Sequence, residues 1–101
     1  MNLRDIIGEL FHAMEWSDAR MWSAVHKSTD AQNDARVREL IHHLHMVQRA
    51  FLSVWRGAPE RPPALETFAD TSAIEAWART YYAEARAFID ALDDAALERP
   101  I

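Results

Sequence analysis

Residues 37–57 read VRELIHHLHMVQRAFLSVWRG, and this stretch decides the fold class. Its apolar side chains recur at intervals of three or four residues, which is the spacing of one face of an α-helix. Gly57 follows the last of them, and glycine is the residue that most often ends a helix. We therefore predict a helix over about 34–56. Its apolar face, centred on Leu44 and Phe51, is expected to point into the core.

The same helical spacing occurs on both sides of this stretch. It runs through residues 3–27, directly after Asn2, which is a favourable N-cap residue. It returns in residues 72–97, where Ser72 and Glu75 have the spacing of a capping box. The sequence therefore predicts three long helices.

The segment between the second and third predicted helices breaks the helical pattern. Residues 57–63 contain one glycine and three prolines, and proline removes a backbone donor that a helix needs. The whole connection has about 15 residues, which is enough to run the length of a helical bundle. We therefore predict one all-α domain over residues 1–101, an up-and-down helical bundle.

The composition limits the classes of function. The chain has 101 residues, no cysteine and a formal net charge of −5. Disulfides and thiol ligands are excluded, and the acidic balance leads us to expect no nucleic-acid partner. The N-terminus lacks a basic, apolar leader, and no apolar run reaches the ~18 residues of a membrane span. We therefore expect a cytoplasmic protein with no membrane partner.

Three histidines of the central helix differ in their expected positions. At 100° per residue, His42 points away from the predicted apolar face, whereas His43 and His45 lie on its two flanks. His43 shares its flank with apolar side chains, so a metal ion is one partner that would suit it there. In the first helix, Asp18 lies inside the apolar stripe. Its carboxylate must be hydrogen-bonded, paired locally with an arginine, or placed near a bound cation.

Three stretches of the chain resemble the DinB/YfiT-like proteins, a bacterial family. They are residues 10–22 (LFHAMEWSDARMW), residues 40–57 (LIHHLHMVQRAFLSVWRG) and residues 72–100, which end in FIDALDDAALERP. The resemblance implies an up-down-down-up four-helix bundle that holds a divalent metal ion, nickel or zinc, with three histidines. One of these histidines comes from the second helix, and two, spaced His-x-x-x-His, come from the fourth.

The same resemblance assigns site residues. His43 lies eight positions before the aromatic Phe51 and matches the second-helix ligand, with His45 as the weaker alternative. Asp18 matches an asparagine near the mouth of the family's site. Trp22 and Val47 are expected as further neighbours of that site.

The chain departs from the family because it ends where the connection to the fourth helix begins. The His-x-x-x-His pair is absent, so the resemblance implies an incomplete metal site. Either the chain is a fragment of a longer protein, or a second copy covers the groove that the fourth helix would fill. For both cases we expect a homodimer in which the apolar stripes of residues 3–27 and 72–97 complete the bundle. The resemblance implies a metal-dependent thiol S-transferase or hydrolase, with a small molecule or thiol as ligand. The alternative, which we favour for this chain, is a non-catalytic dimeric helical binding module.

Overall fold

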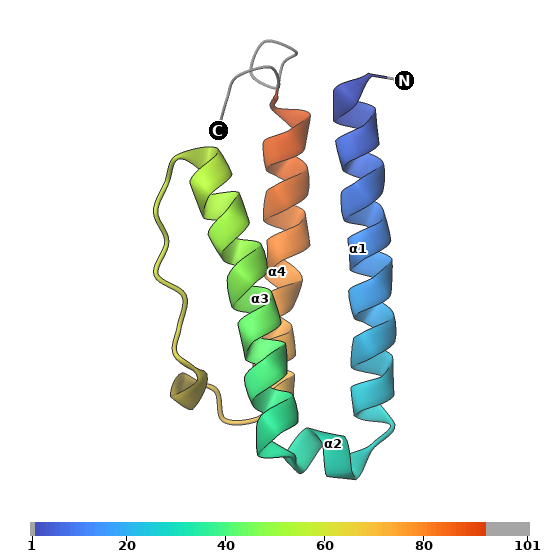
Figure 1. The fold of residues 1–101 in the computed structure, drawn as a ribbon, viewed down its shortest axis with the longest axis vertical. Coiled ribbons are helices and arrows are strands. Elements are labelled where there is room, and N and C mark those ends of the chain that lie inside the picture. The colour runs from blue at the N-terminus through green and yellow to red at the C-terminus, as the bar shows by residue number, and fades with distance from the viewer. Residues whose placement is uncertain (1, 93–101) are drawn as a thin grey trace.

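The structure is a computed structural model of the chain, and it describes residues 2–92. Its helices and turns include no strand, which confirms the predicted all-α class for these residues (Figure 1). The elements are the three long helices α1 (Leu3–His26), α3 (Ala35–Arg56) and α4 (Thr71–Asp90), the short helix α2 (Thr29–Asn33) and the 3₁₀ turn η1 (Leu65–Thr67).

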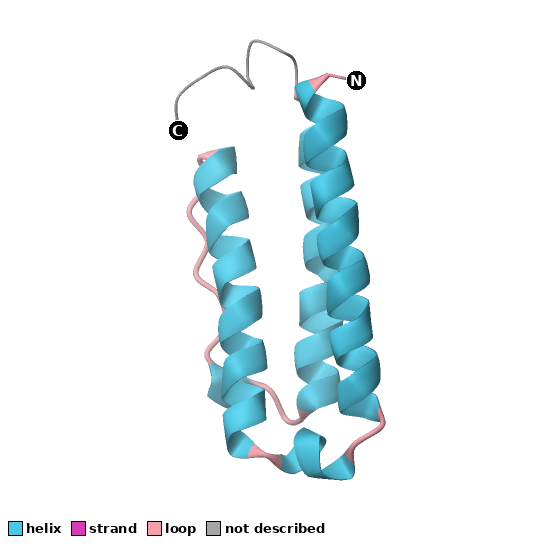
Figure 2. Ribbon diagram, turned by 45° about the vertical axis from the view of Figure 1, so that its right-hand side comes forward, coloured by secondary structure: helices cyan, strands magenta, loops and turns pink. Residues whose placement is uncertain are grey.

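The long helices lie side by side with one reversal of direction. In Figure 1, α1 runs downward from the N-terminus, α2 turns the chain, and α3 runs back up. The segment 58–70 then returns along the outer side of α3, so that α4 runs parallel to α3. The predicted crossing connection is confirmed. Helix α4 packs against both α1 and α3 (Figures 1 and 2).

The ends of α1 and α3 follow from their capping residues. Asn2 accepts a hydrogen bond from the Asp5 backbone N–H, and the Asp5 side chain accepts one in return from Asn2. Asp34 caps α3 through the Val37 N–H at 2.9 Å. Gly57 ends this helix in the left-handed conformation, with φ of 65°. Both helices lie within one residue of their predicted limits.

Helix α4 differs from the prediction at both ends. Asp70, not Ser72, is its N-cap and accepts a hydrogen bond from the Ala73 N–H at 2.9 Å. The predicted capping residue Glu75 is buried and binds His26 and Arg79 instead. The helix ends at Asp90 rather than near residue 97. Residues 93–97 lie outside the described part of the chain.

The core forms where α4 contacts its two neighbours. One cluster, near the α2 end, joins Trp22 and Val25 of α1 to Ile41 of α3 and Ile74 of α4. A second cluster consists of Leu52, Tyr81, Tyr82 and Ala85. The apolar stripe of α4 is therefore buried within the chain. The homodimer stays a prediction, but this buried stripe is not available to a second copy.

The orientation of α3 is the largest departure from the sequence prediction. Its buried residues are mostly polar, and they include His42, His45, Gln48 and Arg49. The predicted inward face is exposed, with Leu44 36% and Phe51 72% accessible to solvent. The expectation that His42 points outward is therefore also wrong. The helix buries its polar side and presents its apolar side outward.

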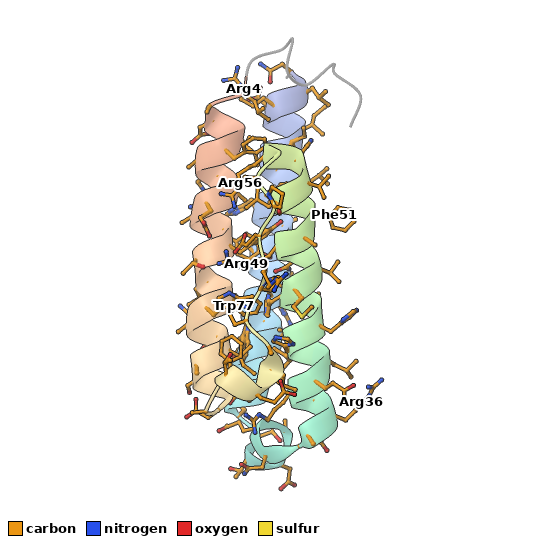
Figure 3. The ribbon with its side chains drawn as sticks, turned by 90° about the vertical axis from the view of Figure 1, so that its left-hand side faces the viewer. Arg4, Arg36, Arg49, Phe51, Arg56 and Trp77 are labelled. Carbon is orange, nitrogen blue, oxygen red and sulfur yellow. The ribbon has the colours of Figure 1, made fainter. Side chains whose placement is uncertain are left out.

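Arg49 shows why a polar face can be buried here. Its side chain is 5% exposed, and its guanidinium pairs with Glu60 at 3.2 Å and with Glu84 at 2.9 Å. It also donates to the Trp77 carbonyl at 3.2 Å. A buried charge is tolerated when it is paired and its donors are used. Figure 3 shows Arg49 between α3 and α4, whereas Phe51 extends away from the bundle.

His42 is satisfied by the crossing segment. Its Nε2 atom lies 2.8 Å from the Pro63 carbonyl oxygen, and its ring packs on Trp77 and Phe68. The segment 58–70 thus covers the polar side of α3 and supplies partners for it. Among the helices of residues 2–92, none has the length and hydropathy that crossing a bilayer requires.

Candidate functional site

A continuous chain of hydrogen bonds links side chains of α1, α3 and α4. The Trp22 indole N–H donates to Nε2 of His45 at 3.3 Å. His45 Nδ1 and the side-chain oxygen of Gln48 are 2.8 Å apart. Because Nε2 accepts from Trp22, the ring proton resides on Nδ1 and is donated to Gln48. His45 and Gln48 are three residues apart on α3, so they lie on one face of the helix.

The chain of hydrogen bonds ends at Asp18 of α1. The Gln48 amide N–H donates to Asp18 Oδ2 at 2.7 Å and also lies 3.3 Å from the Tyr82 hydroxyl. The Tyr82 hydroxyl, from α4, donates to the same Asp18 oxygen. Of the arrangements that we expected for Asp18, the hydrogen-bonded carboxylate is the one that the structure shows. Its partners are neutral side chains, so the alternative of a local arginine pair does not apply.

The electrostatics of this network agree with its hydrogen-bond directions. Burial lowers the pKa of His45, although the Gln48 hydrogen bond and the Asp18 charge partly oppose this shift. His45 is therefore neutral near pH 7, as its bond from Trp22 requires. Burial raises the pKa of the Tyr82 phenol, and the Asp18 hydrogen bond and charge raise it further. Tyr82 therefore stays protonated and acts as a donor.

A cavity of about 230 Å³ opens beside this network, between α1 and α4. We call it the Asp18 cavity. Its lining comprises Glu15, Asp18, Ala19, Trp22, His45, Glu75, Ala78, Arg79 and Tyr82. The structure therefore brings together Asp18 and Trp22, two of the predicted neighbours, and His45, the weaker predicted ligand.

Two carboxylates of the lining are already paired with cations. Glu75 Oε1 lies 2.9 Å from His26 Nε2, and its other oxygen accepts from Arg79 at 2.9 Å. Burial alone would raise the pKa of Glu75, but the hydrogen bonds from Arg79 and His26 outweigh it and lower the pKa. Glu15 pairs with Arg86 at 2.7 Å.

His43 and Val47 lie elsewhere. His43 is exposed, and it borders a shallow hollow between α3 and the proline-rich segment, together with Arg36 and Met46. The expected position of His43 at the core edge is therefore wrong. Val47 is 39% exposed and lies on the apolar side of α3.

The described residues do not match the donor set of a bound metal ion. Within residues 2–92, no three His, Asp or Glu side chains are placed to share one ion. His45, the histidine nearest to Asp18, has both ring nitrogens engaged, one by Trp22 and one by Gln48. A structural or catalytic metal ion needs three or more protein ligands. No chemical step through a metal is therefore derived for this part of the chain.

A second feature, on the other side of α3, is an apolar groove of about 710 Å³ between α1 and α3. Its lining includes Phe11, Met14, Leu44, Val47, Phe51 and Tyr81. Nine large apolar side chains of α1 and α3 are exposed, five of them in the lining of this groove, and we call the nine together the open face. They are Leu3, Ile6, Leu10 and Met14 of α1 and Leu40, Leu44, Val47, Phe51 and Val54 of α3.

Comparisons of the chain with models of protein families, with curated proteins and with solved structures found no match. The residues that line the Asp18 cavity and the apolar groove are therefore the guide to what each of them can bind.

Sequence reasoning missed Gln48 and Tyr82 as members of the site. Two spacings could have suggested the network: His45 and Gln48 are three residues apart on one helix, and Asp18 and Trp22 are four apart on another. The partner from α4 had no such signal. Tyr81 and Tyr82 are adjacent, and only the packing decides which of the two hydroxyls reaches Asp18.

Proposed function

We propose that this chain is a non-catalytic helical binding module that acts as a homodimer through its open face. The observation that carries the proposal is the row of apolar side chains on the outer side of α3. A monomer would leave this row in water, and monomeric proteins rarely expose apolar patches of this kind. The row consists of Leu40, Leu44, Val47, Phe51 and Val54, which are between 36% and 72% exposed.

The spacing of this row supports a helix as the occupant. Successive members are separated by four, three, four and three residues. This is the heptad pattern by which one helix packs its side chains between those of another. A second copy of the chain carries the same pattern, so the face is self-complementary, as a two-fold dimer requires.

The size of the open face also supports a dimer. Its nine side chains are between 36% and 72% exposed, so a large apolar area of each copy is in water. Burying this area against a second copy is favourable by roughly 25 cal/mol for each Å² removed from water. The groove lining is almost entirely apolar, so a charged partner has no counterpart there.

An antiparallel arrangement of the two α3 helices suits the row best. It pairs Leu44 with the partner's Val47, and Leu40 with the partner's Phe51, so that alternate heptad positions meet in layers. Antiparallel helices also have favourable dipoles. Arg36 then lies near the negative C-terminal end of the partner helix, whereas a parallel pair would bring two arginines together.

Light scattering of the chromatographed protein tests the proposal. We expect a dimer at low micromolar concentration, and a folded monomer for Phe51→Glu, because a carboxylate cannot be buried in the apolar interface. Trp16→Glu is the matched control. Trp16 is 60% exposed on α1 but lies outside the groove, so this variant should stay dimeric.

Three results would contradict the homodimer. They are a wild-type monomer that unfolds cooperatively, an equal loss of the dimer in Trp16→Glu, and a dimer that survives Phe51→Glu. Circular dichroism checks that each variant is helical. If Phe51→Glu is unfolded, the milder Val54→Lys, at a 65% exposed position, replaces it.

The resemblance to DinB/YfiT-like proteins supports a second candidate, a metal-dependent thiol transferase. The observation in its favour is that His45 lines the Asp18 cavity and is neutral, as a metal ligand must be, although binding an ion would require it to give up its hydrogen bond with Trp22 or Gln48. Metal analysis of protein purified without a histidine tag tests it. Stoichiometric nickel or zinc that is lost in His43→Ala or His45→Ala supports this candidate, and metal-free protein contradicts it.

A further inference from the structure

Asp18 uses its two carboxylate oxygens unequally. Both hydrogen bonds that it accepts, from Gln48 and from Tyr82, go to Oδ2. Within residues 2–92, no donor is in hydrogen-bond contact with Oδ1. Asp18 is half-buried and lines the Asp18 cavity. One oxygen is therefore fixed by the network, and the other is left for a group that enters the cavity.

The charge of Asp18 also lacks a cationic partner. The other two carboxylates of the lining, Glu15 and Glu75, are each paired with an arginine. In the described part of the chain, Asp18 has no such pair, and its two donors are neutral. A half-buried carboxylate is more stable beside a cation, and the acidic protein as a whole attracts cations.

The walls and size of the cavity limit the cation that fits. Trp22, Ala19 and Ala78 provide apolar lining, and Tyr82 adds a second aromatic ring. Aromatic walls favour organic cations. The volume of about 230 Å³ is below the ~300–1,000 Å³ of sites for drug-sized ligands, so the ligand is small. A divalent metal ion would need several oxygen ligands, and Glu15 and Glu75 are already engaged.

We propose that the Asp18 cavity binds a small organic amine in its ammonium form. The ammonium group donates to Asp18 Oδ1, and the apolar body of the amine lies against Trp22 and the two alanines. The chain of hydrogen bonds from Trp22 through His45 and Gln48 holds the Asp18 carboxylate in place for this contact. None of the nine open-face side chains lines the Asp18 cavity, so the amine can bind whether or not the dimer forms, although Gln48 of the network also lines the groove.

Isothermal titration with benzylamine, using benzyl alcohol as the neutral probe of the same shape, tests the proposal. We expect the amine to bind at least about tenfold more tightly than the alcohol, since the ion pair contributes at least ~1.4 kcal/mol. Asp18→Asn should remove this preference. Glu9→Gln, which changes an exposed carboxylate of the same helix outside the cavity, is the matched control and should keep it.

A second variant covers the case in which Asp18→Asn does not fold. Ala19→Phe fills the cavity from an exposed position and leaves Asp18 and its partners intact, so it should abolish amine binding in a folded protein. The proposal is overturned if benzylamine does not bind wild-type protein, if amine and alcohol bind equally, or if Ala19→Phe binds as well as wild type. It is also overturned if zinc or magnesium alone binds at Asp18 and the amine does not.

Discussion

The two sides of α3 are reversed compared with most surface helices, because its buried side is mostly polar and its exposed side is apolar. The side that faces α4 and the crossing segment buries His42, His45, Gln48 and Arg49, while the outer side exposes Leu40, Phe51 and Val54. A helix in a complete bundle normally does the reverse. The inner side is tolerated because its buried polar side chains are paired at most of their polar atoms, as Arg49 is with Glu84. The apolar side of α3 therefore has the composition of a helix face that packs against another helix, as the proposed dimer requires.

Adjacent residues on the two sides should respond very differently to truncation. Leu52→Ala removes a side chain that is 2% exposed and should lower the free energy of unfolding by about 3 kcal/mol. Phe51→Ala, at a 72% exposed site, should cost less than about 0.5 kcal/mol in dilute protein. Chemical denaturation measures both.

The effect of protein concentration on stability distinguishes Phe51→Ala from Leu52→Ala further. If Phe51 lies in a dimer interface, the loss in Phe51→Ala grows with protein concentration, because association stabilises only the wild type. The loss in Leu52→Ala is already large in dilute protein. Equal losses for the two variants in dilute protein would mean that both sides are buried within one copy.

Two arginines of α3 provide the second test. Arg49→Ala removes the nearer of the two arginines that pair with Glu60 and Glu84, and Arg56 remains at 3.6 and 3.8 Å. It should cost about 2–3 kcal/mol, below the usual value for a buried pair, because both glutamates are partly exposed and keep one cation. Arg36→Ala breaks an exposed pair with Glu39 and should cost less than about 0.5 kcal/mol. Thermal unfolding followed by circular dichroism compares them. A similar small effect for both would show that Arg49 is not part of a buried network.

The smallest expected effect is a pH dependence from His45. Burial lowers its pKa in the folded state below the ordinary value of 6.5, so the unfolded chain takes up the proton first as pH falls. Stability is complete above pH 6.5 and decreases below it, with a slope from this one proton of at most about 1.4 kcal/mol per pH unit. His45→Gln should reduce the slope just below pH 6.5. Glu75, whose folded pKa is lowered, stabilises the fold above its ordinary value of 4.5, and this contribution is lost only as the pH falls below that value. An unchanged slope in His45→Gln would exclude this assignment.

The positions of the helices could be predicted from the sequence, but not which side of α3 is buried. The three-to-four spacing and local caps such as Asn2 and Gly57 are contained within a few residues. The burial of His42 and Arg49 depends on Pro63, Glu60 and Glu84, which lie 11 to 35 residues away. Periodicity carries no information about such partners.

In the candidate site, Asp18 could be predicted from the sequence, but its partners could not. Asp18 stood out because a carboxylate inside an apolar stripe requires a partner. One of its partners, Tyr82, lies 64 residues further along the chain, and its position depends on how α4 packs. His43 was selected by resemblance and by a helix orientation that the packing reverses, whereas His45 is the histidine that reaches the cavity.

Cysteine cross-linking tests the central claim most directly, namely that the outer side of α3 packs antiparallel on a second copy. The chain has no cysteine, so Leu40→Cys and Phe51→Cys each carry a single thiol. When the two variants are mixed and oxidised, we expect a disulfide between them, because antiparallel packing brings these positions together. Each variant alone, and the control Trp16→Cys, should remain largely unlinked. The absence of a link in the mixture, or equal self-linking of each variant, would contradict the account.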